Sequence, residues 1–589
     1  MKILIEECVY TNPAILDFLK KADSQRNEGK VPFVGYMYDA DYNDFIFFLP
    51  KVILNKEGKV FGQFAPEDLW KINQELVQKQ YEFLCSFPIW IYRAVNNYYY
   101  HDPSNRIVQK QQLSGMDAST GKGHVPFLEN ILELVRFANE NKNFLLFKMK
   151  HMHNGGGKVN WPKTISYQQP FLKKGKAPIY LNPVIKRKDV DYEEELLVIY
   201  FSVLRHINSQ YGFSSDINVN FELLPKTQFD DYLHGEGTRR LREIRYKYFS
   251  DKTLRIWHLC YAFFSQKDKI NNSSNYDEYL LASQFDRVFE TMVDYLIGYN
   301  QTELPKYIKK KQEDDKIIDH LFIYRSLTNP DKNTYYIADS KYYPTGKGTE
   351  GTSFFKQFTY ARNLRHEILS EIWKQRRGSK SDNVESCIDE KTEGYDIIPN
   401  FFLSAFIDST YSYDIDGIKR RESQDESFFH FPNRLFDRET LLLSHYDINF
   451  LYVIKQYAIN HNESKKDFHD KIYNKFRNDI LERLNREYKF FILELKNKPK
   501  QGEEQKALKK AIDPIFRLVN GKVYCPKKEP SYTNLILALE NPENHISASS
   551  KQLEEENRKV IAALEKDFVT PKEFKLGANI EEIIKKTAG

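Results

Sequence analysis

The chain has few cysteines and no long apolar run. Its 589 residues include five cysteines, scattered without a CxxC spacing. This pattern predicts neither a disulfide framework nor a zinc site, and it is typical of a reducing compartment. No apolar run approaches the roughly 20 residues needed to cross a bilayer, and the N-terminus turns acidic at Glu6 and Glu7, before a signal-peptide core could form. We therefore expect a soluble, cytoplasmic protein with no membrane partner.

A phosphate-binding loop is also lacking. Five residues rather than four separate Gly115 from Gly121-Lys122, and Gly123 stands where the motif needs Ser or Thr for magnesium. The segment 344–348 departs from the motif in a similar way. We expect neither segment to bind a nucleotide, so any nucleotide energy must come from another chain.

What the sequence does contain is ample apolar and aromatic content. Hydrophobic residues make up 41% of the chain and aromatic residues 15%, and the length exceeds what a single core usually supports. The net charge of +5 permits a nucleic-acid partner without requiring one. We divide the chain into an N-terminal mixed α/β domain (1–180), a helical bridging region (181–270), a third domain (271–460) and a helical C-terminal region (461–589).

Two predicted strands in the third domain carry charged side chains. Residues 316–324 and 335–343 are apolar and aromatic runs separated by a turn-forming segment, which predicts a hairpin. Side chains two positions apart share a strand face, so Asp339 and Lys341 are expected to point the same way. Antiparallel pairing would bring Asp319 next to Asp339 and leave Lys341 beside both.

This grouping is typical of metal-dependent phosphodiester cleavage. Two close carboxylates repel each other, and a hard divalent cation with oxygen ligands relieves that repulsion. Such a cation can bind a phosphate oxygen and lower the pKa of an attacking water, while a nearby lysine stabilises developing charge. The helix predicted over 285–297 carries Glu290 near the edge of its apolar face. We therefore expect Asp319, Asp339 and Glu290 to bind metal, with Lys341 as a catalytic cation.

The order of these elements resembles the PD-(D/E)XK nuclease fold, since a helix over 353–369 and a buried strand over 397–407 follow the hairpin. Within that fold the chain is similar to McrC and LlaJI-type restriction endonucleases. The similarity lies in Phe289-Glu290, Asp339-x-Lys341-Tyr342, Lys356-Gln357-x-x-Tyr360 and residues 157–165. One departure is Ile318, which stands where the family has proline before Asp319, so that Asp314 and Asp315 remain alternatives to Asp319.

The resemblance implies an α/β (α+β) fold with a PD-(D/E)XK nuclease core, an N-terminal mixed α/β DNA-recognition domain and helical additions. It also implies a type II-like deoxyribonuclease that cuts double-stranded DNA with Mg2+ in phage defence, with Gln357 in the catalytic set. The resemblance implies an McrB-like AAA+ GTPase as partner. The chain could also form a homodimer. The alternatives are a stand-alone site-specific endonuclease, and a DNA-binding scaffold in which Asp339 and Lys341 form a structural ion pair.

One candidate DNA contact follows a glycine run. Lys158, Asn160, Trp161 and Lys163 combine two cations, an amide able to read adenine and a stacking ring. The alternative is that Trp161 and the proline after it anchor a loop. We predict that these residues bind DNA.

Two helices offer further candidate contacts. Arg239 and Arg242 lie on one stripe of a helix predicted over 237–249, which suits a phosphate backbone, although a solvated helix face explains them equally well. Lys356 and Tyr360 share one helix surface, where core packing of Tyr360 is the alternative.

The C-terminal region has a helical apolar pattern. Leu481, Leu484, Tyr488 and Ile492 are spaced at three and four, which predicts a helix through this segment. We expect residues 496–510 to be a linker and the segment after Ser549 to be a helical tail.

Overall fold

The structure is a computed structural model of the chain, and it describes most of it. The described residues are 2–22, 29–70, 76–101, 106–111, 126–142, 144–153, 157–172, 174–213, 215, 217–272, 277–312, 316–329, 332–345, 352–377, 394–421, 433–459, 462–497, 499–500, 503–525, 534–544 and 547–578. The glycine-rich segment around 115–123 lies outside them. In the described part of the chain, no helix combines the length and apolar character that a membrane crossing needs.

The N-terminal domain is built on a five-stranded sheet with the order β1-β3-β2-β8-β4. Strands β2 and β3 form an antiparallel hairpin, as the two apolar runs in this segment indicate, and both are almost entirely buried. Strand β8 completes the sheet by pairing with β2, so the domain extends beyond the boundaries drawn from the sequence at 180 and 270. The strands are β1 (Lys2–Ile5), β2 (Val34–Asp39), β3 (Asp44–Leu49), β4 (Val108–Gln111) and β8 (Asp277–Ala282).

Helices pack on this sheet and on one another. In α7 the apolar residues Leu241 and Ile244 are buried, because they follow the helical period and α7 packs against α8. The helices are α1 (Pro13–Ala22), α2 (Gln78–His101), α3 (Phe127–Glu140), α5 (Glu195–Tyr211), α6 (Lys226–Asp231), α7 (Gly237–Ile244) and α8 (Asp251–Asn272).

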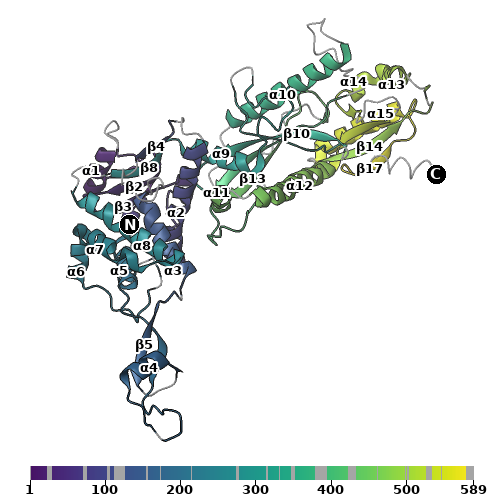
Figure 1. Ribbon diagram of the computed structural model, residues 1–589. Helices are drawn as coiled ribbons and strands as arrows, with labels where there is room; N and C mark the ends of the chain where they lie inside the picture. Colours follow the sequence, from purple (N-terminus) through teal and green to yellow (C-terminus); the bar gives the residue numbers. More distant parts are fainter. Residues whose placement is uncertain are drawn as a thin grey trace.

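An arm projects from the N-terminal domain, away from the rest of the molecule (Figure 1). It consists of β5 (Phe147–His153), β6 (Lys158–Val159) and β7 (Val184–Val190), which form an antiparallel sheet in the order β5-β7-β6, together with helix α4 (Trp161–Tyr167). Because β7 pairs with β5, the boundary expected near residue 180 falls inside the arm.

The central domain contains a second five-stranded sheet, in the order β12-β13-β11-β10-β9. Strands β9 and β10 form the antiparallel hairpin that the sequence predicts, and β10, β11 and β13 run parallel. Parallel strands are usually buried on both faces, which accounts for their nearly continuous apolar sequences. The strands are β9 (His320–Arg325), β10 (Asn333–Lys341), β11 (Pro399–Phe406), β12 (Lys419–Arg420) and β13 (Leu442–Asn449).

Helices lie on both faces of the central sheet (Figure 1). Helix α10 (Thr352–Arg377) packs on the face that bears Ile337 and Phe402. Helices α9 (Phe285–Ile297), α11 (Phe450–Ile459) and α12 (Asn462–Glu487) pack on the face that bears Tyr336 and Phe401. This two-layered cover confirms the predicted mixed α/β class.

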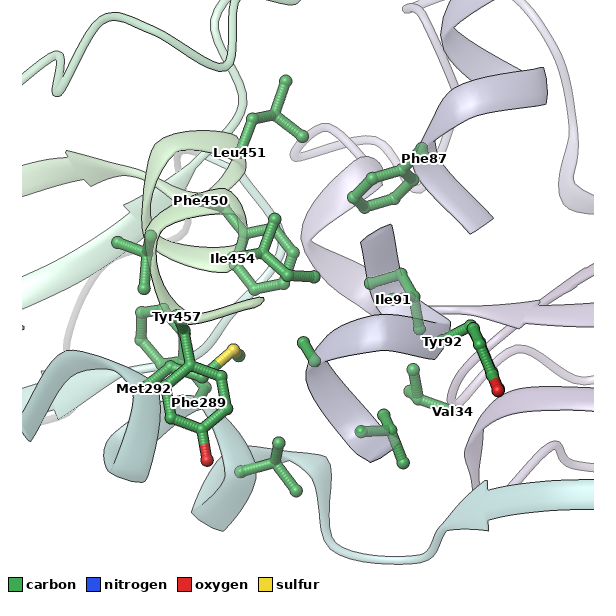
Figure 2. Close-up of a cluster of buried hydrophobic side chains, with 14 of the residues drawn as sticks. Val34, Phe87, Ile91, Tyr92, Phe289, Met292, Phe450, Leu451, Ile454 and Tyr457 are labelled. Atoms are coloured by element: carbon green, nitrogen blue, oxygen red, sulfur yellow. The ribbon is translucent and has the colours of Figure 1, made fainter. Parts of the chain in front are cut away.

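The N-terminal and central domains share one apolar core. Figure 2 shows Phe87 and Ile91 of α2 facing Phe450 and Ile454 of α11, with Phe289 of α9 beside them. All five side chains are at most 1% exposed. The two domains are therefore joined by a packed interface rather than by a flexible linker.

The C-terminal region differs from its predicted helical character. Helix α12 ends at Glu487, and the next residues form β14 (Tyr488–Glu494) in a four-stranded sheet with the order β15-β16-β14-β17. Tyr488 and Ile492 fit a helical period and a strand period equally well, and pairing of β14 with β16 and β17 decides between them. The other elements are α13 (Glu504–Ile512), α14 (Phe516–Val519), α15 (Ser547–Leu564), β15 (Val523–Tyr524), β16 (Asn534–Glu540) and β17 (Lys572–Phe574).

Candidate active site

The register of β9 and β10 brings two carboxylates together. Ala338 lies opposite His320, so that Asp339 and Asp319 follow and precede this pair at the same end of the hairpin. The Ser340 amide donates a hydrogen bond to Asp319 Oδ2 at 3.2 Å, which holds the Asp319 side chain against β10. Asp314 and Asp315, the alternatives to Asp319, lie outside the described residues.

Lys341 and Asp339 form an ion pair on the face of β10 that α10 covers. Their side chains are 10% and 7% exposed, and the Lys341 ammonium also lies 5.1 Å from the centre of the Phe402 ring. The shared face follows from the alternation of side chains along a strand. The structure thus places Asp339 and Lys341 together, as the Asp-x-Lys spacing predicts.

Glu290, on helix α9, adds a third carboxylate near Asp319 and Asp339. Burial, followed by the charges of Asp286 and Asp339, raises the pKa of Glu290 to about 7. Burial and the charges of Asp339 and Glu290 raise the pKa of Asp319 well above its ordinary value. The charge of Asp339 therefore contributes to destabilising the ionised forms of both Glu290 and Asp319.

The chemistry of this donor set fits a hard divalent cation. Carboxylate oxygens are the ligands that such ions prefer, and a cation would favour the ionised forms of Asp319 and Glu290, which burial and, after it, repulsion from neighbouring carboxylates now disfavour. Among the described residues, no three His, Cys, Asp or Glu side chains are grouped at metal-binding distance. Asp319, Asp339 and Glu290 therefore do not form such a group in this arrangement of their side chains.

Gln357 lies on α10, which covers the face of Asp339 and Lys341. Its side chain is fully buried, and neither amide atom has a hydrogen-bond partner among the described residues. A buried amide without partners costs free energy, so such a group in a native protein calls for an explanation. Ordered water would provide partners for it.

A buried polar chain lies behind the carboxylates, and sequence analysis did not identify it. His320 Nε2 and Ser340 Oγ are 2.6 Å apart, and His320 Nδ1 lies 3.3 Å from Asp294 Oδ1. Asp294 also accepts a hydrogen bond of 2.7 Å from Lys310 Nζ. These bonds connect α9 to both strands of the hairpin and so stabilise the register that sets Asp319 against Asp339. A histidine and a serine on two strands predicted to pair could have indicated the first of these contacts. The pairing of Asp294 with Lys310 depends on the tertiary fold, and no sequence pattern indicates it.

A groove of about 870 Å³ opens beside Lys341. Glu290, Ser340 and Lys356 line it from the central domain, and Lys356 is exposed there. Residues of the N-terminal domain line the opposite part, a contribution that the sequence did not indicate. Of the predicted catalytic side chains, Glu290 and Lys341 thus line an accessible groove between two domains, whereas Asp319, Asp339 and Gln357 are not among its lining residues.

The predicted DNA contacts on the arm divide into two kinds. Lys158, Trp161 and Lys163 are exposed, whereas Asn160 is only 6% exposed and its side chain accepts a hydrogen bond from the Lys163 amide at the start of α4. Asn160 is therefore a helix cap, which explains its residue type without base recognition. Figure 1 shows the arm far from β10, so these residues do not join the carboxylate group.

The remaining predicted contacts are engaged within the protein. Arg239 pairs with Glu236 and Glu243 on α7, and Arg242 donates a hydrogen bond of 2.6 Å to the Tyr261 hydroxyl. Tyr360 is 6% exposed and packs in the core under α10, the alternative considered for it. Arg239 and Arg242 are exposed and stay predictions as DNA contacts, but they are not free cations.

The raised pKa of Glu290 predicts a pH-dependent stability. Folding retains a proton on Glu290 between pH 4.5 and about 7, so without metal the free energy of unfolding falls as pH rises through this window. Glu290→Gln mimics the protonated side chain and is expected to stabilise the protein by about 1–3 kcal/mol above pH 7 and by little near pH 4.5. Urea unfolding in a chelator, at several pH values, measures this difference.

The exposed Glu57 provides the control, as Glu57→Gln removes a surface charge on another domain. A gain from Glu290→Gln that is the same at all pH values would contradict the assigned cause. Added divalent metal should also raise the free energy of unfolding at pH 8, and it should do so more for the parent protein than for the Glu290→Gln variant.

Comparisons with known proteins bear on the identity of this site. The LlaJI restriction endonuclease family model matches residues 135–409. A chain in the cryo-EM structure of the Thermococcus gammatolerans McrBC complex is also similar, with 12% sequence identity, 51% of this chain and 89% of that chain covered, and a TM-score of 0.18. The search of curated proteins finds no match. Residues 135–409, which include Glu290, Asp319, Asp339, Lys341 and Gln357, thus match the LlaJI restriction endonuclease family and confirm the family predicted from the sequence.

Proposed function

We propose that the chain is a restriction-type endonuclease that hydrolyses phosphodiester bonds of double-stranded DNA with a divalent metal, Mg2+ being the ion we expect. The observation that carries the proposal is the meeting of Asp319, Asp339 and Lys341 at one end of the β9–β10 hairpin, beside an open groove. The family match over this region supports the same chemistry.

Asp319, Asp339 and Glu290 would hold the cation through carboxylate oxygens. A bound divalent ion supplies Lewis-acid stabilisation of a phosphate oxygen and a water of lowered pKa. Lys341 lies beside Asp339, where its ammonium balances charge that develops on the phosphate. The buried Gln357 amide provides a donor and an acceptor that no described protein group uses.

The substrate contacts that the structure supports are the exposed lysines. Lys356 lines the groove, and Lys158, Lys163 and Trp161 are exposed on the arm. Lysine ammonium groups bind phosphates through charge, and an exposed indole ring can stack on a base. We place the scissile bond at the groove and treat the arm as a separate contact to DNA.

The proposal of a GTPase partner is based on the sequence alone. The chain is similar to McrC in its motifs and lacks a phosphate-binding loop, so a motor-coupled reaction would need an McrB-like AAA+ subunit. A homodimer is a further assembly to test by sizing. One specific observation favours a second function, a non-catalytic DNA-binding scaffold: Asp339 and Lys341 pair their opposite buried charges without metal.

Cleavage assays test these possibilities. The protein is incubated with linear and supercoiled duplex DNA in Mg2+, in Mn2+ or in a chelator, with and without a candidate GTPase and GTP. We expect cleavage only with metal, and stimulation by GTP when the GTPase is present. Metal-dependent cleavage that needs no GTPase would indicate a stand-alone endonuclease. Duplex binding without cleavage under every condition would favour the scaffold.

A further inference from the structure

The groove beside the carboxylates belongs to two domains. Its lining includes Lys341 and Lys356 from the central domain, and Glu6, Lys30 and Lys51 from the N-terminal domain. The N-terminal contribution is far away in sequence, so it depends on how the two domains are joined.

Hydrogen bonds tie the N-terminal part of the groove directly to the strand that bears Asp339. The Tyr342 hydroxyl, one residue after Lys341, donates to Glu6 Oε2. Thr345 makes two more bonds across the domain boundary, from its amide to the Leu54 carbonyl and from Oγ1 to the Val52 carbonyl, each at 2.8 Å. Together with the apolar interface of α2, α9 and α11, these bonds hold both walls of the groove in one geometry.

Two of the N-terminal charged groups have structural partners. Lys51 pairs with Glu7 at 2.8 Å, and its ammonium lies 5.0 Å from the centre of the Tyr342 ring. Glu6 is 6% exposed and accepts the Tyr342 hydrogen bond. Both residues therefore stabilise the joint between the domains.

Lys30 has no such partner. Its backbone is held by a bridge with Val9, and the neighbouring Val31 amide donates to the Cys8 carbonyl at 3.2 Å. Its side chain is exposed, and no acidic group of the described residues lies within ion-pair distance of it. Lys356 on α10 is likewise exposed and without an ion-pair partner in that part of the chain. Two free ammonium groups from different domains thus line one groove at a candidate phosphodiesterase site.

We infer that Lys30 of the N-terminal domain is a phosphate-binding residue of the nuclease groove, acting with Lys356 on the backbone of the nucleic acid that enters it. This inference rests on the proposed function, because it takes a phosphodiester polymer as the ligand. Exposed ammonium groups at a groove bind such a polymer by releasing condensed counterions, independently of base sequence. The N-terminal domain is then part of the cleavage site and not only a carrier of the arm.

The test measures duplex binding by the full chain in a chelator, so that no cleavage occurs, between about 50 and 200 mM salt. Lys30→Ala is expected to weaken binding at low salt and to reduce the slope of log affinity against log salt by about 1. Lys356→Ala should do the same, and Lys30→Arg should retain the slope of the parent. The control is Lys59→Ala, which removes an exposed lysine of the N-terminal domain outside the groove and should leave the slope unchanged.

The outcomes separate this inference from the proposed function. An unchanged slope for Lys30→Ala, or an equal change for Lys59→Ala, overturns the role of Lys30 while leaving metal-dependent cleavage intact. A reduced slope for Lys30→Ala in a protein that cuts no DNA supports the phosphate site and contradicts the proposed nuclease activity. Duplex binding that does not depend on salt overturns the phosphate site itself.

Discussion

Asp339→Asn is expected to lower the rate of duplex cleavage by at least about 100-fold. The change keeps the size of the side chain but removes its charge, which Lys341 and a bound cation both require. Initial rates of cleavage at saturating Mg2+, measured with the parent and the variant on the same duplex, give the effect. DNA binding in a chelator should stay within a few-fold of the parent.

The single variant leaves the Lys341 ammonium buried without its partner, which by itself can destabilise a protein by about 3–5 kcal/mol. Lys341→Met and the double variant Asp339→Asn/Lys341→Met therefore accompany it. The double variant should recover the stability that Asp339→Asn loses, because no unpaired charge remains, and it should still be inactive. Recovery of cleavage together with stability would show that the pair is structural and that the reaction occurs elsewhere.

Phe450→Ala is expected to reduce the free energy of unfolding by about 3–5 kcal/mol. The Phe450 side chain is fully buried at the interface of the two domains, and its ring lies 5.7 Å from Phe289 and 6.1 Å from Phe87 (Figure 2). Truncation to alanine removes apolar contacts to α2 and α9 and leaves a cavity that rigid neighbours fill only in part. Urea unfolding followed by tryptophan fluorescence and circular dichroism measures the loss.

Phe249→Ala is the matched control, because Phe249 is 84% exposed on the N-terminal domain. Its effect should lie within about 0.5 kcal/mol. Since the Phe450 ring also lies 6.4 Å from Tyr342, cleavage by Phe450→Ala should decline at temperatures where the protein is still folded. A Phe450→Ala protein as stable as the parent would contradict the shared core of the two domains.

Local patterns in the sequence were sufficient for the elements that carry the carboxylates. The helical period of Phe285, Phe289, Met292 and Leu296 predicted the buried face of α9, and all four side chains are at most 2% exposed. The apolar runs and the turn-forming segment predicted the β9–β10 hairpin. Such features depend on neighbours within a few residues, so they can be read without knowledge of the fold.

The same patterns were insufficient where one segment suits two structures. Tyr488 and Ile492 fitted a helix extended from α12, but hydrogen bonding with β16 makes them part of a strand. Asn160 fitted a base-reading amide, and only its burial and the start of α4 show that it caps a helix. In both cases a contact outside the local window decides the outcome.

The sequence by itself determined the chemical content of this protein: an Asp-x-Lys strand, an aspartate directly before the strand that pairs with it, and an acidic helix. Only the tertiary structure decided what surrounds them. It inserted β8 between β2 and β4 of the N-terminal sheet, paired His320 with Asp294, and brought Lys30 to the groove of Lys341. The physical reason is that periodicity reports contacts within a helix or a strand, whereas contacts between distant segments depend on the packing of the whole chain.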